Sequence, residues 1–163
     1  MERVTFQDKK LVEKIKASCV CTWQNVFPGY ETTRGSATVT ASMARCPPGT
    51  ASANVATIFS TGDGKVLHIA PGLLSPEDLA RELDFALSVD RAVKEAGENA
   101  AARARAFVAA HDARRAELAE AKGLDLDWKV MLTQVHKVLR SRPMVAREAL
   151  QLSDYFPTVD KRT

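Results

Sequence analysis

The fold of this chain is decided by residues 54–87, which read NVATIFSTGDGKVLHIAPGLLSPEDLARELDFAL. A short apolar run at residues 55–59 is followed by Thr61-Gly62-Asp63-Gly64, whose two glycines can adopt the positive φ values of a hairpin turn. Residues 65–70 alternate to opposite sides of a return strand. This part of the sequence therefore predicts a β-hairpin.

A capped helix is predicted directly after the hairpin. In Ser75-Pro76-Glu77-Asp78 the serine can cap the helix. Proline costs no hydrogen bond at the first helical position, because a backbone N–H there would have no partner within the helix. The two carboxylates lie at the positive end of the helix dipole. The buried stripe of this helix is expected to consist of Leu79, Leu83, Ala86 and Leu87.

The residues before the hairpin predict a short helix and a strand. Residues 7–17 place apolar side chains at helical spacing among charged ones, which indicates an amphipathic helix. Residues 19–27, CVCTWQNVF, are almost uncharged and rich in β-branched and aromatic types, as in a strand buried on both faces. Residues 30–53 show no clear period, and their role stays open.

The sequence becomes wholly helical after residue 90. Residues 91–122 are rich in strong helix formers and interrupted by Gly97, which predicts either one long bent helix or two in succession. Another helix starts at Asp125 or Asp127 and ends before Pro143, with an apolar stripe of Trp128, Met131, Leu132, Val135 and Leu139. We predict two parts, residues 1–90 and residues 91–163.

The order of elements in residues 6–90 resembles the thioredoxin-like fold superfamily. Residues 54–59, the Asp63-Gly64-Lys65 turn and Gly72 are similar to the hairpin of that family, and residues 75–87 are similar to its last helix. The resemblance implies an α/β protein with a thioredoxin-like three-layer core, to which residues 91–163 add a helical C-terminal extension.

Two features of the family are missing from this sequence. Its Cys-x-x-Cys dithiol would fall at or before residue 6, where no such motif is present, and its cis-proline is replaced by Ala53 or Asn54. The chain is therefore interpreted as an atypical or N-terminally truncated member. We expect a binding or scaffold module without conventional dithiol oxidoreductase activity.

Cys19, Cys21 and Cys46 are the candidate catalytic residues of the alternative interpretation, an atypical thiol-disulfide oxidoreductase. A Cys-x-Cys pair can act as a redox couple or hold a soft metal. In a strand, however, Cys19 and Cys21 would lie about 6.6 Å apart along the axis, whereas a disulfide needs Cβ atoms about 3.8 Å apart. We expect these two to pack in the core and Cys46 to be exposed, with a Cys21–Cys46 pair as an open alternative.

His68, His111 and His136 are far apart in the sequence and lack metal-ligand spacing. His68 is expected at a packing position or facing solvent. We therefore predict no metal site and no cofactor.

Other chemically suggestive residues have simpler structural explanations. Trp23 is expected to fill the core, and the Gly62-Asp63-Gly64 trio is a turn rather than a phosphate loop, because no helix follows it. Asp125 and Asp127 are explained by capping. The basic stretch of the third helical segment, Arg103, Arg105, Arg114 and Arg115, predicts a solvated face.

Composition limits the classes of partner. The net charge of +3 is too small to imply nucleic acid. No apolar run approaches the roughly 20 residues that cross a bilayer. A cytoplasmic protein is expected, or a periplasmic or secreted one if an upstream signal peptide precedes this sequence. A protein partner fits the scaffold interpretation, and residues 98–152 could instead form a helical partner-docking module or a homo-oligomer interface.

Overall fold

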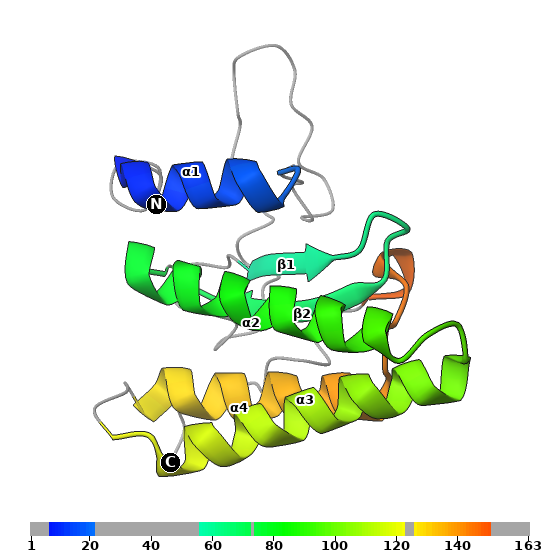
Figure 1. The fold of residues 1–163 in the computed structure, drawn as a ribbon. Coiled ribbons are helices and arrows are strands. Elements are labelled where there is room, and N and C mark those ends of the chain that lie inside the picture. Colours follow the sequence, from blue (N-terminus) through cyan, green and yellow to red (C-terminus); the bar gives the residue numbers. More distant parts are fainter. Residues whose placement is uncertain (1–6, 22–55, 73, 123–125, 151–163) are drawn as a thin grey trace, which may run out of the picture.

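The computed structural model describes residues 7–21, 56–72, 74–122 and 126–150, and these form a mixed α/β structure (Figure 1). They contain four α-helices and a two-stranded antiparallel sheet. In chain order the elements are α1 (Lys9–Ser18), β1 (Ala56–Ser60), β2 (Val66–Pro71), α2 (Pro76–Glu95), α3 (Ala100–Glu120), α4 (Leu126–Ser141) and a 3-10 turn (Arg147–Ala149). None of the described helices is long and apolar enough to cross a membrane.

The predicted hairpin is confirmed. β1 and β2 pair antiparallel, with Phe59 opposite His68, and the N–H of Thr61 donates to the carbonyl of Lys65 at 2.9 Å to close the turn. Gly64 has a φ of +80°, a value that glycine adopts without the strain it imposes on other residues. All six residues of β2 are buried.

β2 is buried because helices from different parts of the chain pack against it. It packs against both α2 and α4, and α3 packs against α2 and α4. In Figure 1, α3 and α4 lie side by side below the hairpin, and α1 lies above it. β2 is therefore the centre of the structure, and a side chain on it can meet residues from all three later helices.

A segment after α4 completes the hydrogen bonding of β2. Met144 has a left-handed φ of 51°, and the chain reverses there after α4 ends at Ser141. The N–H of Val66 donates to the carbonyl of Val145 at 2.9 Å, and the N–H of Arg147 donates to the carbonyl of Gly64 at 2.8 Å. The start of β2 is thus paired on the side away from β1.

α2 begins as predicted but runs further than expected. Ser75 Oγ accepts from the N–H of Asp78 at 3.1 Å, so Ser75 is the cap. The helix continues to Glu95, because Val89 and Val93 extend its buried stripe by two further turns. It stops before Gly97, whose φ is +76°.

The boundary predicted between residues 90 and 91 therefore falls inside α2. The segment predicted over 91–122 consists of the end of α2 and of α3, separated at Gly97. The main hydrophobic core joins the hairpin to all three later helices and contains Val66, Leu67, Ile69, Val89, Val93, Phe107, Val135 and Leu139. The helices after residue 90 share this core with the sheet.

The strand predicted over residues 19–27 is not found where the structure describes it. α1 matches the predicted helix closely and is capped by Asp8, whose Oδ1 accepts from the N–H of Leu11 at 2.8 Å. Beyond α1, Val20 is 99% exposed and Cys21 is also exposed. Apolar and β-branched types do not by themselves bury a segment. Trp23, the rest of this segment and residues 30–53 lie outside the described residues.

The apolar stripe of α4 packs inside the chain. Leu132, Val135 and Leu139 have no exposed surface, and Trp128 Nε1 donates to the carbonyl of Pro71 at 3.3 Å. Burial removes these three side chains from a partner, whereas Trp128 and Met131 are half-buried. The docking module predicted over residues 98–152 stays a prediction.

Replacing Ser75 with alanine is expected to lower the free energy of unfolding by about 1 kcal/mol, because the N–H of Asp78 loses its cap. The measurement is urea unfolding followed by circular dichroism. Ser75→Asp, which restores an acceptor, should lie within a few tenths of a kcal/mol of the parent. Equal stability of the alanine and aspartate variants would show that the cap contributes nothing.

Candidate metal centre

Three histidines from three separate elements meet in the core. His68 lies on β2, His111 on α3 and His136 on α4, and all three are completely buried. One ring nitrogen from each lies within 4.8 Å of one ring nitrogen from each of the others. These are all the histidines in the chain.

The histidines occupy core positions of their elements. His111 follows Phe107 by four residues on α3, and His136 follows Leu132 by four residues on α4, so each histidine shares a helix face with a buried apolar residue. His68 lies in the middle of the fully buried strand β2. Burial of each element's apolar face therefore directs an imidazole into the shared core.

Glu82 on α2 holds His68. Its Oε2 lies 2.6 Å from His68 Nε2, and both side chains have no exposed surface. Arg114 donates to the other oxygen, Oε1, at 3.2 Å. Burial would raise the pKa of Glu82, but the hydrogen bond from His68 and the charges of His68 and Arg114 outweigh it, and the pKa is lowered. The ionised carboxylate can only accept, so the hydrogen of this bond is carried by His68 Nε2.

A second chain of hydrogen bonds fixes the other two rings. His111 Nε2 lies 3.0 Å from the carbonyl oxygen of Leu67, which can only accept. A neutral His111 therefore presents an unprotonated Nδ1, and His136 Nδ1 donates to it at 2.7 Å. The lone pair of His136 then lies on Nε2.

His111 and His136 are held in the neutral form that metals bind. Burial lowers the pKa of His111 to about 3, with a further contribution from His68 and a partly opposing one from the Leu67 carbonyl. Burial also lowers the pKa of His136, and the neighbouring His68 and His111 add to that effect. Neutral imidazole nitrogens are common metal ligands in proteins.

Two buried nitrogens of the cluster lack partners among the described residues. Neither His68 Nδ1 nor His136 Nε2 makes a hydrogen bond to a described residue. Each such atom costs about 1 to 3 kcal/mol when it is removed from water without compensation. Coordination of an ion is one means of compensating them.

Phe85 completes the cluster as a fourth ring. It is nearly perpendicular to all three imidazoles, with centroid distances of 4.9 Å to His68, 5.2 Å to His111 and 5.1 Å to His136. The imidazole centroids are themselves 4.9 to 6.1 Å apart. Five of the six centroid distances lie between 4.9 and 5.2 Å and the sixth, from His68 to His111, is 6.1 Å, so the four centroids form a distorted tetrahedron with Phe85 at the fourth corner.

The separation of the ring nitrogens is close to that of a metal site. The candidate ligand nitrogens lie within 4.8 Å of one another, whereas two nitrogens bound to one ion at about 2.0 to 2.1 Å are at most about 4.2 Å apart, so the rings would close slightly around an ion. His68, His111 and His136 would be the ligands. Glu82 and the Leu67 carbonyl would be the partners that orient two of them.

The convergence of the three histidines was not expected from the sequence. The prediction of no metal site rested on their lack of ligand spacing, and spacing detects only ligands that share one element or loop. The sequence contains a weaker indication of the cluster. His111 and His136 each continue an apolar stripe at helical spacing, so each imidazole is expected to be buried and to need a polar partner.

The other predicted site residues do not meet in one place within the described structure. Cys19 is partly buried and Cys21 is exposed, so the expectation that both pack in the core is wrong for Cys21. Cys19 caps the end of α1, where its backbone N–H donates to the carbonyl of Ile15. Cys46 lies outside the described residues, as do the side chains of Asp125 and Asp127.

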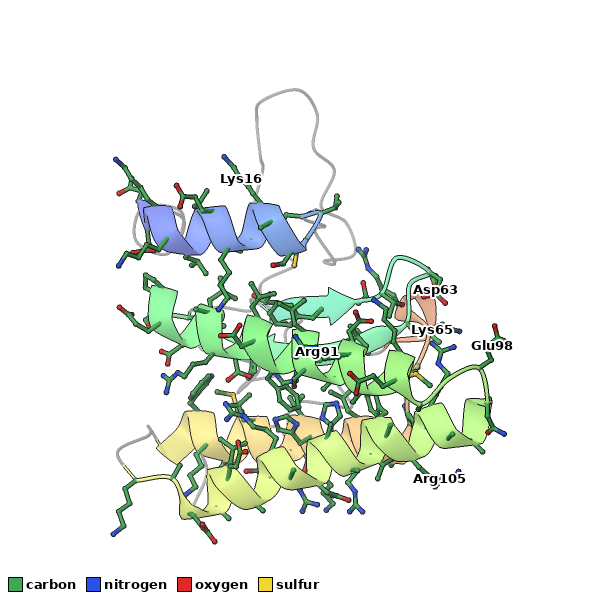
Figure 2. The ribbon with its side chains drawn as sticks, viewed as in Figure 1. Lys16, Asp63, Lys65, Arg91, Glu98 and Arg105 are labelled. Atoms are coloured by element: carbon green, nitrogen blue, oxygen red, sulfur yellow. The ribbon has the colours of Figure 1, made fainter. Side chains whose placement is uncertain are left out.

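The basic stretch of α3 divides between solvent and core. Figure 2 shows Arg105 pointing away from α2, on the outer side of α3, which agrees with the predicted solvated face. Arg114 differs, because its side chain is 22% exposed and reaches the buried Glu82. Its Cζ also lies 5.7 Å from the centroid of Phe85. The need to balance a buried carboxylate explains why this arginine turns inward.

Comparisons of this chain with protein-family models, with curated proteins and with solved structures find no match.

In the presence of a chelator, the free energy of unfolding should fall as the pH is lowered from about 6 to about 4.5. The unfolded histidines bind protons below their ordinary pKa while the folded His111 and His136 do not, so each contributes up to about 1.4 kcal/mol per pH unit. Denaturant unfolding across this range measures the slope. His111→Gln, which does not titrate, should lose part of the slope, and pH-independent stability would contradict neutral burial.

Iodoacetamide should label Cys21 faster than Cys19 in the native protein. Cys21 is exposed, whereas burial, followed by the nearby Cys21, raises the pKa of the Cys19 thiol and lowers its thiolate fraction. Peptide mass spectrometry after timed quenching measures both rates. In guanidinium the rates should converge, and faster native labelling of Cys19 would contradict the structure.

Proposed function

We propose that this protein binds a transition-metal ion through His68, His111 and His136. The observation that carries the proposal is the convergence of three completely buried imidazoles, two of which have a ring nitrogen without a partner in the described residues. Imidazole suits zinc, copper, nickel and iron. His68 Nδ1 and His136 Nε2 are free to coordinate within the described structure, whereas His111 Nδ1 would exchange its hydrogen bond from His136 for the ion.

The position of the site supports a structural role for the ion. Its three ligands come from β2, α3 and α4, so coordination would join the sheet to two helices. All three ligands lack solvent exposure, whereas a catalytic metal needs a position open to substrate. A bound ion would stabilise the folded chain by mass action.

A second proposal follows from the thioredoxin-like resemblance, which implies a binding or scaffold module without dithiol chemistry. The hairpin, its glycine turn and the helix capped by Ser75 support it. The exposed Cys21 leaves the thiol-enzyme alternative open to test by insulin reduction, which Cys21→Ser should abolish if that alternative holds.

Metal binding is tested on the chain in which Cys19, Cys21 and Cys46 are replaced by serine, because thiolates would bind the same ions. After chelator treatment, the protein is dialysed separately against Zn²⁺, Co²⁺ and Ni²⁺ and, without oxygen, against Cu(I). At least one ion should be retained at one equivalent per chain by elemental analysis and should raise the thermal midpoint. Each of His68→Asn and His136→Asn should abolish retention.

Two variants make this test specific. Lys137→Ala changes an exposed neighbour of His136 on α4 and should leave binding unchanged. Glu82→Gln keeps an acceptor for His68 but removes its charge, and should weaken binding about 10- to 100-fold. The proposal fails if no ion is retained, or if the histidine variants retain as much as the parent.

A further inference from the structure

We propose that this centre selects a monovalent d¹⁰ ion, Cu(I), over Zn²⁺. The inference rests on the proposed function and concerns which ion the three imidazoles hold. Two independent features of the site carry it: the ring at the fourth corner of the cluster, and the balance of charge around it.

The fourth corner offers no donor atom. Structural zinc is almost always four-coordinate, and a three-histidine zinc site fills its fourth position with water. Here that corner holds the ring of Phe85, 4.9 to 5.2 Å from each imidazole centroid. A phenyl ring excludes water from its own corner and supplies no lone pair. Three-coordinate binding suits Cu(I) better than Zn²⁺, because both ions have a filled d shell but the single charge of Cu(I) demands fewer ligands.

Phe85 can still interact with a cation. The face of an aromatic ring attracts positive charge. Phe85 is half-buried, and the Arg114 Cζ already lies 5.7 Å from its ring centroid. Phe85 lies three residues after Glu82 on α2, so one helix face provides both the ring beside the site and the carboxylate that orients His68. A soft, weakly hydrated monovalent ion accepts such a neighbour more readily than a divalent ion that prefers water.

The charge around the site also favours a single positive charge. Imidazoles bring no negative charge to an ion, and the carboxylate beside His68, Glu82, is already paired with Arg114 at 3.2 Å. The positive charges of Arg114 and Arg115 also act on His136. No thiolate or carboxylate is available in the ligand set to neutralise a divalent ion. Because the cost of burying an ion grows with the square of its charge, Zn²⁺ would pay about four times the desolvation of Cu(I).

The test uses the full chain with its three cysteines replaced by serine. Cu(I) is added without oxygen in the presence of bicinchoninate, whose copper complex absorbs visible light, and Zn²⁺ is then titrated as competitor. We expect Cu(I) to be bound at least about 100-fold more tightly than Zn²⁺. His111→Gln should return the copper to the chelator, which shows that the histidines hold it.

Phe85 gives the decisive pair of variants. Phe85→His supplies a fourth nitrogen and should raise Zn²⁺ affinity relative to Cu(I) by about 10-fold or more, whereas Phe85→Leu keeps an apolar fourth corner and should leave Cu(I) favoured. Circular dichroism and unfolding of each variant confirm that it folds.

The possible results distinguish the preference for Cu(I) from metal binding itself. If the histidines bind both ions and Zn²⁺ displaces Cu(I) at equal concentration, the selectivity is wrong and metal binding stands. If Phe85→His and Phe85→Leu shift the two affinities equally, the fourth corner does not set the preference. If neither ion binds the parent, both proposals fail.

Discussion

The hydrogen bond between Glu82 and His68 is the interaction on which the interior depends. It buries a carboxylate and an imidazole at 2.6 Å in a core whose other buried side chains, apart from His111 and His136, are hydrophobic. Removing a carboxylate from water costs several kcal/mol unless its oxygens are satisfied. Here one oxygen meets His68 and the other meets Arg114, so three elements must be in place together: β2, α2 and α3.

This requirement couples the hairpin to the helices more tightly than apolar packing would. Apolar side chains tolerate small displacements, whereas a buried carboxylate loses the hydrogen bonds that compensate its burial when one partner moves. His111 extends the same constraint to the backbone of β2 through Leu67, and His136 extends it to α4. The polar groups therefore fix the position of the helices relative to the sheet, while the aliphatic residues supply most of the driving force for burial.

The sequence predicted those parts of the fold that are encoded locally. The Thr61 to Gly64 turn, the Ser75 cap and the stop at Pro143 each depend on a few neighbouring residues, and the structure contains all three features. The expected strand at Cys19 failed because propensity cannot tell whether another element covers a segment. The histidine cluster could not be predicted from spacing, since its geometry exists only after β2, α3 and α4 have packed. A buried imidazole four residues after Phe107 indicates that a partner is needed, but not which one.

The bridge from β2 to the segment after α4 bears on how the molecule folds. Val145 and Arg147 hydrogen-bond to Val66 and Gly64 across the whole helical region, so this pairing closes a long loop of chain. Long-range pairings slow folding, because loop entropy is lost before the contacts reward it. The hairpin can form early, yet one side of β2 stays unpaired until the segment beyond α4 returns. During synthesis on the ribosome the backbone groups at the start of this edge would be open to other chains, and their pairing with the returning segment removes them as a template for edge-to-edge aggregation.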